Sequence, residues 1–173
     1  MRNPRARTAW QLNLVLYAMT DRIDIKGPLL DQGLVCEEIL TDLPEWFGIE
    51  QANRDYVERV ATLPTFVAFV EETPVGFMSL LQHSPQSAEL YVLGVRRQYH
   101  RHGVGKLLLE ASERYLRQQG VKYVLVKTLA ALADDENYEK TRAFYEGQGY
   151  VPLEVFLELW DPGNPCLQMI KGI

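Results

Sequence analysis

The feature that most constrains this chain is a strand, a glycine-containing loop and a helix in immediate succession. The apolar run Ser87–Val95 predicts the strand, the loop reads RRQYHRHGVGK, and a helical pattern begins at Gly105. Glycines at positions 103 and 105 let the backbone approach a bulky anion and direct successive N–H groups at it. The start of a helix adds unpaired amides and the positive end of the helix dipole. This unit therefore predicts an anion-binding site.

The charge of the loop agrees with that prediction. Its cations are Arg96, Arg97, Arg101 and Lys106, and residues 96–106 contain no acidic side chain. A locally basic loop in a chain of net charge −5 concentrates anion binding at one place. The same net charge argues against a nucleic-acid partner, because a protein that binds the phosphate backbone needs a basic face.

Two other phosphate-binding motifs do not fit this loop. A Walker A loop requires glycine where His100 stands and serine or threonine where Leu107 stands. A dinucleotide fingerprint requires glycine at position 108, which is leucine. A tight turn into a surface helix, with no ligand, is the plain structural alternative.

The rest of the chain alternates short strands with helices. Strands are expected at 22–26, 65–70, 75–81, 87–95, 121–128, 150–160 and 166–171, and helices at 34–43, 49–63, 105–119 and 138–148. This order predicts an α/β sandwich built on a mixed sheet. A chain of 173 residues has room for one domain of ordinary size.

Three segments resemble the GNAT superfamily of N-acetyltransferases. HRHGVG (100–105) is similar to the family's motif A, Q/R-x-x-G-x-G/A, with His100 in place of the usual glutamine or arginine. AELYVLGV (88–95) is similar to the strand that precedes this motif, and TRAFYEGQGY (141–150) is similar to motif B. The resemblance covers Arg22–Lys171 in the expected order of elements.

The resemblance implies a GNAT-type three-layer α/β fold. Its central sheet is mixed, mostly antiparallel and splayed at the fourth and fifth strands, with helices on both faces. Residues 21–173 would form this single domain, and residues 1–20 an N-terminal extension or extra strand. The implied activity is transfer of acetyl from acetyl-CoA, without a metal, to an amine of a small molecule or peptide. A catalytically silent CoA-binding module and an acyltransferase for a larger acyl-CoA are alternatives, and a homodimer is left open.

The resemblance also assigns residues to the cofactor. The backbone N–H groups of Leu93 and Val95 would pair with the pantetheine arm as an added strand, and the loop would hold the pyrophosphate. The loop positions concerned are His100, Arg101, His102, Gly103, Val104, Gly105 and Lys106. Gly94 is expected to mark the bulge that splays this strand from the next.

An amine must lose a proton before it attacks a thioester, because an alkylamine with a pKa of about 10.4 is protonated at neutral pH. The resemblance singles out Glu89 as the base, on a strand face shared with Tyr91 and Leu93. A solvated carboxylate near a strand start is the alternative, because strands alternate faces. The rival bases, in the helices on the substrate side, are Glu37, Glu38 and Glu45.

Tyr145 matches the tyrosine of motif B, which the resemblance places beside the leaving thiolate. A phenol can protonate a thiolate with a pKa of about 8.5, or donate a hydrogen bond to it. A core aromatic is the alternative, since Phe144 and Tyr138 are aromatic neighbours. Tyr138 itself stands where asparagine is common in the family.

The cysteines, the histidines and the N-terminus indicate no further chemistry. Cys36 and Cys166 lie far apart and are expected to be reduced thiols in a cytoplasmic protein. His83 and the two loop histidines lack the spacing of a metal-ligand set. The apolar run at 12–19 is shorter than the roughly 20 residues that span a membrane. Neither a metal nor a membrane is therefore expected as a partner.

Overall fold

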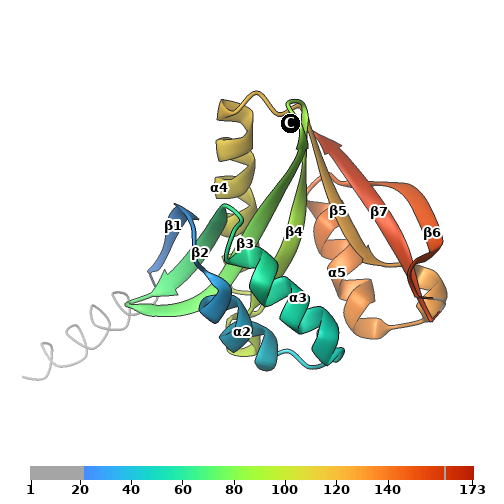
Figure 1. Ribbon diagram of the computed structural model, residues 1–173, viewed down its shortest axis with the longest axis horizontal. Helices are drawn as coiled ribbons and strands as arrows, with labels where there is room; N and C mark the ends of the chain where they lie inside the picture. The colour runs from blue at the N-terminus through green and yellow to red at the C-terminus, as the bar shows by residue number, and fades with distance from the viewer. Residues whose placement is uncertain (1–21, 162) are drawn as a thin grey trace, which may run out of the picture.

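The computed structural model describes residues 22–161 and 163–173 (Figure 1). Its strands are β1 (Ile23–Leu29), β2 (Thr65–Val70), β3 (Thr73–Ser84), β4 (Ser87–Val95), β5 (Tyr123–Leu129), β6 (Val151–Asp161) and β7 (Asn164–Gly172). Its helices are α2 (Gly33–Thr41), α3 (Glu50–Val60), α4 (Val104–Gln118) and α5 (Glu136–Gly147), with single 3₁₀ turns η2 (Arg97–Tyr99) and η3 (Ala131–Ala133). The extension expected at 1–20 lies outside the described residues. None of the described helices is long and apolar enough to cross a membrane.

The described strands form one mixed sheet in the order β1-β2-β3-β4-β5-β7-β6. Neighbouring strands are antiparallel except β4 and β5, which run parallel. β4 and β5 pair only where Ser87–Leu90 lies beside Tyr123–Val126, although both strands continue beyond it. From there the two strands diverge, as Figure 1 shows. The predicted splay between the fourth and fifth strands is confirmed.

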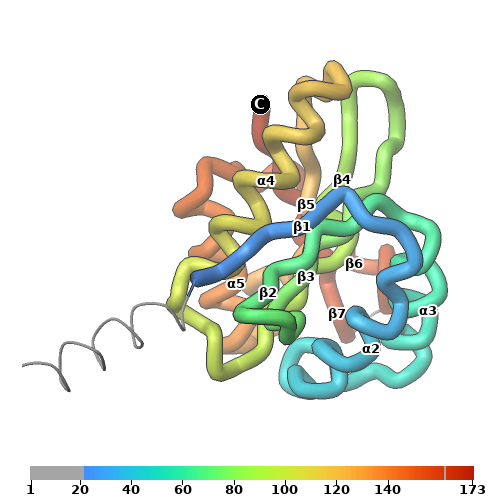
Figure 2. Tube along the Cα trace, turned by 90° about the vertical axis from the view of Figure 1, so that its left-hand side faces the viewer, coloured from blue at the N-terminus to red at the C-terminus, as the bar shows by residue number. Residues whose placement is uncertain are grey.

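Helices cover both faces of the sheet and give three layers (Figure 2). α4 and α5 lie on one face, where Leu108, Leu109 and Tyr145 join the larger core. α2 and α3 lie on the other face, over a smaller core that includes Ile39 and Phe77. The predicted three-layer α/β fold is confirmed.

Helix α4 shows how the sequence specifies its elements. Buried side chains recur at Leu108, Leu109, Ser112 and Leu116, so one stripe of the helix faces the core. The helix ends before Gly120, which has φ +82°, a left-handed conformation that glycine adopts without steric penalty.

The bulge in β4 is at Tyr91. The register against β3 skips one residue of β4 between Leu90 and Val92, so Tyr91 has no direct partner. An extra residue of this kind bends the strand and increases its twist. It lies where the pairing with β5 ends, and the strand therefore turns away from β5 at this point.

Gly94 has a different reason to be glycine. It pairs regularly with Phe77, and a Cβ at this position would lie 2.8 Å from the Phe77 ring and 2.9 Å from Ile39. The missing side chain thus allows α2 to pack closely on β4. The prediction that Gly94 marks the bulge is wrong, because close packing and a bulge both select glycine in a strand.

The buried carboxylate of Glu113 links α4 to β7 through hydrogen bonds. Glu113 is 4% exposed, and its oxygens accept hydrogen bonds from Lys171 Nζ at 2.7 and 2.9 Å. Arg117 and the Tyr150 hydroxyl donate to the same carboxylate at 3.0 and 3.1 Å. Burial, and then the nearby Glu113 charge, raises the pKa of Tyr150 above its ordinary value.

We expect Glu113→Ala to lower the free energy of unfolding by about 3 kcal/mol, because it leaves the partly buried Lys171 without its charge partner. Denaturation with urea measures this change. Glu110→Ala is the matched control, since Glu110 lies on the same helix, is about half exposed and is 3.8 Å from Lys106. An exposed pair of this kind contributes at most about 1 kcal/mol. Equal losses of unfolding free energy in the two variants would show that Glu113 stabilises the fold no more than an exposed carboxylate does.

Candidate active site

The loop between β4 and α4 enters the left-handed region twice, at Arg101 with φ +66° and at Gly103 with φ +83°. Left-handed residues beside right-handed ones make successive N–H groups converge, which forms a concavity that binds anions. Arg101 adopts this conformation although a residue with a Cβ disfavours it. Such residues cluster at binding and catalytic sites.

The N-terminus of α4 has no cap. No side chain accepts a hydrogen bond from its first turn, and that turn holds no acidic residue. The first bond of the helix runs from Leu107 N–H to the Gly103 carbonyl at 3.0 Å, so the N–H groups of residues 104–106 have no acceptor in the described chain. In α5, by contrast, the Asp135 side chain accepts two backbone hydrogen bonds. α4 therefore presents free amides and a positive dipole end.

The two glycines of the loop have different reasons to be glycine. Gly103 requires a left-handed backbone, and a Cβ there would meet nothing within 4 Å. Gly105 is helical, and a Cβ there would make an ordinary contact with Phe144 at 3.4 Å. Alanine is more favourable than glycine within a helix by about 1 kcal/mol, so the fold alone does not explain Gly105. Close approach of a ligand to the backbone does explain it.

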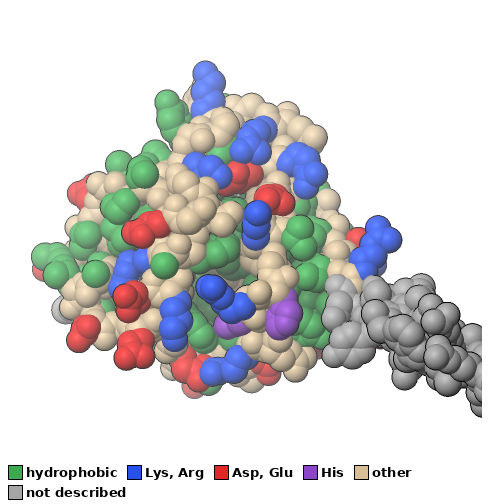
Figure 3. Space-filling model, turned by 180° about the vertical axis from the view of Figure 1, so that it is seen from behind, with side chains coloured by type: hydrophobic (Ala, Val, Ile, Leu, Met, Phe, Trp, Pro, Cys, Tyr) green, Lys and Arg blue, Asp and Glu red, His purple; other side chains and the backbone are tan. Residues whose placement is uncertain are grey.

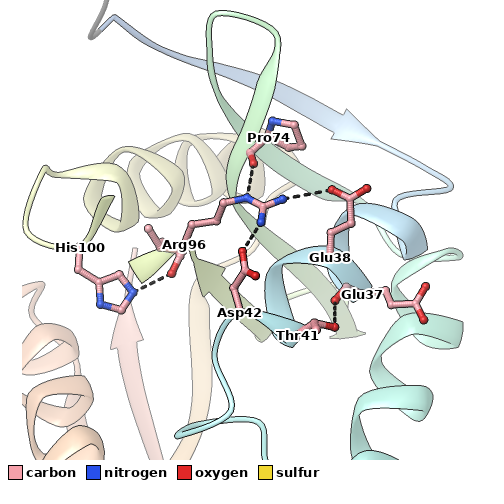
Figure 4. A network of polar contacts seen from close by, with 8 residues as sticks. Glu37, Glu38, Thr41, Asp42, Pro74, Arg96 and His100 are labelled. Atoms are coloured by element: carbon pink, nitrogen blue, oxygen red, sulfur yellow. Dashed lines mark hydrogen bonds and ion pairs between the residues drawn. The ribbon is translucent and has the colours of Figure 1, made fainter. Parts of the chain in front are cut away.

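The His100 side chain holds the loop against the end of β4. Its Nε2–H donates to the Val95 carbonyl at 2.7 Å, and Figure 4 shows the ring turned back toward β4. The ring also packs edge-on against Trp46, with centroids 5.5 Å apart. Arg101 and His102, by contrast, are exposed. Of the predicted loop residues, His100 therefore positions the loop, and the following two face outward.

Two of the loop cations are already paired with α2 and with the segment that joins α2 to α3. Arg96 donates to Glu38 of α2 at 3.1 Å and to the carboxylate of Asp42, which directly follows α2 (Figure 4). Arg97 forms an ion pair with Glu45. These contacts fix the flank of the loop to the helices on the other face of the sheet. Their charge is balanced within the chain.

The cationic charge that remains for an anion is smaller than the sequence suggests. In the described part of the chain Arg101 has no ion-pair partner, and Lys106 has only a loose contact with Glu110 at 3.8 Å. Viewed from behind, histidine side chains lie beside lysine and arginine side chains on this face (Figure 3). Arg101 and Lys106 therefore carry the charge of the candidate anion site, and the exposed His102 lies between them in the sequence.

Beyond Leu90, β4 directs the backbone groups of alternate residues toward the side where β5 no longer pairs with it. The Val95 carbonyl accepts from His100, whereas the next N–H, of Arg96, donates to Val75 of β3 at 2.8 Å. Adjacent residues of a strand direct their N–H and C=O groups to opposite edges, so Val95 and Leu93 direct theirs away from β3. Their N–H groups thus lie on the edge from which β5 has separated.

Glu89 is buried in β4, and its side chain is 5% exposed. Its Oε2 accepts hydrogen bonds from Lys127 Nζ at 2.7 Å and from His83 Nε2 at 2.8 Å. Both contacts use the same oxygen, so Oε1 has no donor among residues 22–161 and 163–173. The His83 side chain is 38% exposed and therefore lies between the carboxylate and solvent.

Glu89 faces the α2–α3 side of the sheet together with Tyr91. The Tyr91 ring packs on Tyr56 of α3, with centroids 5.6 Å apart. Burial, with smaller contributions from neighbours that include Glu89, raises the pKa of Tyr56 to about 12. Leu93 packs into the opposite core, because the bulge shifts the alternation by one residue. The predicted common face is therefore wrong for Leu93.

The loop between α2 and α3 is tied to α5. The Tyr138 hydroxyl donates to the Trp46 carbonyl at 2.7 Å, and Trp46 Nε1 donates to Thr141 at 3.2 Å. Burial raises the pKa of Tyr138 to about 12, so its hydroxyl stays a donor at neutral pH. Tyr138, which replaces the asparagine common at this position, thus connects the two helical layers.

Tyr145 lies on the other face of the sheet from Glu89, in the core formed with α4. It is 4% exposed, and its ring packs against those of Phe144 and Tyr150. Burial raises its pKa above the ordinary value. Phe144 also faces the position of Gly105, so α5 brings the tyrosine toward the start of α4.

The rival carboxylates are placed differently. Glu38 and Glu45 are held in ion pairs with Arg96 and Arg97. Glu37 points away from Arg96 (Figure 4) and lines a shallow hollow between α2 and α3. These positions favour Glu89 over its rivals as a proton acceptor near the divergence.

Lys127 is the site residue that sequence reasoning missed. It lies on β5, and the parallel register that pairs Leu90 with Val126 brings it beside Glu89. Its one signal in the sequence is a charge inside the otherwise apolar run YVLVKTL. His83, considered above only as a metal ligand, joins the same cluster. Within the described residues no group of three or more His, Cys, Asp or Glu side chains could hold a metal ion.

A sequence model of the Acetyltransferase (GNAT) family matches residues 34–150. The match begins in α2 and ends just after α5, so it includes the glycine loop, Glu89 and Tyr145. Comparison with curated proteins finds no match.

Solved structures share this architecture. Ard1 from Thermoplasma volcanium matches with a TM-score of 0.68 at 22% identity, over 87% of this chain and 97% of that chain. An aminoglycoside 6′-N-acetyltransferase complexed with coenzyme A matches with a TM-score of 0.68 at 17% identity, over 86% and 96%. A PaiA N-acetyltransferase from Thermoplasma acidophilum, in complex with coenzyme A, matches with a TM-score of 0.66 at 17% identity, over 88% and 99%. At such identities the likeness establishes the fold.

Proposed function

The chain belongs to the GNAT family of acetyltransferases, and from that premise we propose that it transfers an acetyl group from acetyl-CoA to an amine of a small molecule or peptide. The observation that carries the proposal is Gly105, whose missing side chain leaves room for a ligand at the uncapped start of α4. Acetyl-CoA supplies the acetyl group as a thioester. The residues of this chain bind it, orient it and move the protons.

The loop offers the groups that a pyrophosphate requires. Free N–H groups at residues 104–106 and the α4 dipole favour an anion, and the exposed side chains of Arg101 and Lys106 add charge-assisted donors. The exposed His102 adds a further polar side chain. His100 contributes by holding the loop against Val95. The pyrophosphate is therefore assigned to residues 101–106.

The free edge of β4 suits the pantetheine arm. An extended arm with amide groups can add to this edge as a further strand, paired with the N–H groups of Leu93 and Val95. One of these N–H groups can also polarise the thioester carbonyl. β5 does not pair with this edge beyond Leu90, so the edge has no strand partner there among the described strands.

Glu89 is the proposed base. Its Oε1 has no donor in the described chain and is available to an ammonium group or to a bridging water. The first proton passes from the ammonium to Glu89, and the nitrogen lone pair forms a bond to the acetyl carbon. The carbon–sulfur bond breaks with its electron pair on sulfur, and the nitrogen gives its second proton to this thiolate, which leaves a neutral amide and the CoA thiol. His83, between Glu89 and solvent, gives the proton a path out.

Tyr145 is proposed to stabilise the leaving thiolate. Because burial raises its pKa, the phenol remains protonated and donates a hydrogen bond to sulfur throughout the working pH range. Glu89 and Tyr145 lie on opposite faces of the sheet at the strands that separate. An amine from the α2–α3 side and a thioester from the α4–α5 side can therefore meet there, which supports direct transfer.

A thiol-release assay with acetyl-CoA and a panel of amines tests the proposal. The panel includes a polyamine, an aminoglycoside and a lysine peptide, and we expect release that depends on one of them. Binding of acetyl-CoA without release on any amine would support a silent CoA-binding module. Release only from longer acyl-CoA donors would support a larger acyl group. Failure to bind either acetyl-CoA or CoA would remove the cofactor assignment.

A further inference from the structure

We propose that the acceptor is a zwitterion whose amine and carboxylate are attached to the same carbon, as in a free α-amino acid. Lys127 binds the carboxylate of this acceptor, and Glu89 accepts its ammonium group. The inference rests on the proposed function, because it names the acceptor class of that same site. The observation that carries it is the juxtaposition of Lys127 and Glu89.

Lys127 lies where β5 separates from β4. The last pair in the register of these two strands joins Leu90 to Val126, and Lys127 is the next residue of β5. Glu89 directly precedes Leu90, so the two charged side chains meet beside the point where the strands diverge (Figure 1). The proposed transfer takes place at this point. A carboxylate of the acceptor can therefore reach Lys127 while its amine reaches Glu89.

The ion pair leaves a donor and an acceptor free side by side. A lysine ammonium has three N–H donors. Lys127 uses one of them on Glu89 Oε2, at 2.7 Å, and has no other acceptor in the part of the chain that the structure describes. His83 donates to the same Oε2, which leaves Oε1 without a donor there. A ligand that satisfies both free groups must bring a cation and an anion close together, and an α-amino acid does so.

Partial burial makes Lys127 a more selective cation than an exposed lysine. Its side chain is 25% exposed, and that of Glu89 is 5% exposed. Water screens an ion pair at such a place less than it screens a pair on the surface. Hydrogen bonds between charged groups are also stronger than those between neutral groups. A carboxylate bound to Lys127 should therefore contribute measurably to recognition of the acceptor.

The charges near this ion pair also balance. Burial raises the pKa of Tyr91, and the charge of Arg59 opposes that shift. The charges of Glu89 and Asp55 add to it. Arg59 and Asp55 both belong to α3, so this helix brings one charge of each sign close to Tyr91.

Balanced charge favours a zwitterion over a polycation. A polyamine or an aminoglycoside brings further ammonium groups toward Lys127, and like charges repel at close range. An α-amino acid has no excess charge, and each of its charged groups meets one of opposite sign. We therefore expect polycations to be poorer acceptors than amino acids.

Kinetics with matched acceptors test the proposal. Each pair consists of an amino acid and the amine in which hydrogen replaces the carboxylate. The pairs are phenylalanine with 2-phenylethylamine, leucine with 3-methylbutylamine, and lysine with cadaverine. Thiol release from acetyl-CoA gives kcat and KM for each acceptor. In at least one pair we expect kcat/KM to be at least about tenfold higher for the amino acid, the usual effect of a hydrogen bond between charged groups.

The Lys127→Met variant shows whether this preference comes from Lys127. A carboxylate also changes the basicity of the neighbouring amine, and that effect is the same in the wild type and the variant. We expect Lys127→Met to raise KM for the amino acid at least about tenfold and to change KM for the matched amine little. Lys127→Arg keeps the cation and should keep the preference. Lys122→Met, at an exposed lysine just before β5, is the matched control and should behave like the wild type.

The outcomes separate this inference from the proposed function. Equal losses for the amino acid and its amine in Lys127→Met would mean that Lys127 only holds Glu89, and the inference would fail. Release of thiol only with acceptors that lack a carboxylate would also overturn it, while acetyl transfer to an amine would stand. Absence of release with every acceptor would count against the proposed function itself.

Discussion

Replacing Glu89 by glutamine lowers the rate of acetyl transfer at neutral pH by about 10²- to 10⁴-fold, the usual contribution of a positioned general base. Glutamine keeps the shape of the side chain and can still accept from Lys127 and His83, but it cannot take a proton from an ammonium group. The deficit shrinks as the pH approaches the amine pKa of about 10.4, where free amine needs no base. The affinity for acetyl-CoA stays near that of the wild type. Rates measured across pH, with calorimetry for binding, test both statements.

Two control variants separate the lost base from a disturbed fold. Lys127→Met removes the ion pair between Lys127 and Glu89 but keeps the Glu89 carboxylate. We therefore expect a smaller loss of rate than for Glu89→Gln. Glu37→Gln alters an exposed rival carboxylate on α2 and should leave the rate unchanged. Full activity of Glu89→Gln at every pH would rule out Glu89 as the general base. The base would then be one of the rival carboxylates or a bound water.

Tyr145→Phe lowers turnover by roughly 10²-fold or more, because the leaving thiolate loses a hydrogen-bond donor. The sign of the pH dependence distinguishes it from Glu89→Gln. Burial raises the pKa of Tyr145 above its ordinary value, so the wild-type phenol stays protonated as the pH rises and the deficit of the variant persists. A donor whose thiol has a lower pKa should reduce the deficit, since its thiolate needs less stabilisation. Steady-state rates with the two donors measure this difference.

Tyr123→Phe is the matched control for Tyr145→Phe. Tyr123 is 51% exposed at the start of β5, and loss of its hydroxyl should leave the rate unchanged. Phenylalanine at position 145 keeps the ring contacts with Phe144 and Tyr150, so the variant should fold. Recovery of full activity of Tyr145→Phe at alkaline pH would contradict the hydrogen-bond role.

The sequence predicts the fold well because its signals are local. Glycine at 103 and 105, the apolar run before them and the amphipathic pattern of α4 together specify a strand, a turn and a helix in order. The splay of the sheet follows from resemblance to a family, and the pairing of β4 with β5 confirms it. The position of the bulge is not recoverable in this way, because glycine at 94 is explained by close packing of α2 and Tyr91 carries no turn signal.

The electrostatics of the site depend on contacts between distant parts of the chain. Arg96 is neutralised by Asp42 and Glu38, which lie 54 and 58 residues away in the sequence. Lys127 reaches Glu89 from 38 residues away, through a parallel register that local patterns do not specify. The sequence therefore overstates the free charge of the loop and misses one partner of the candidate base.

The central claim is that the backbone at the start of α4 binds the pyrophosphate of acetyl-CoA, and Gly105 tests it most directly. Alanine at this position fits the unbound fold, with an ordinary contact to Phe144, and favours the helix by about 1 kcal/mol. Gly105→Ala should therefore melt at or above the temperature of the wild type. Because the added methyl group occupies space that the phosphates need, we expect calorimetry to show a dissociation constant for acetyl-CoA at least about tenfold higher, or about 1.4 kcal/mol. Wild-type affinity in the folded Gly105→Ala variant would contradict the account.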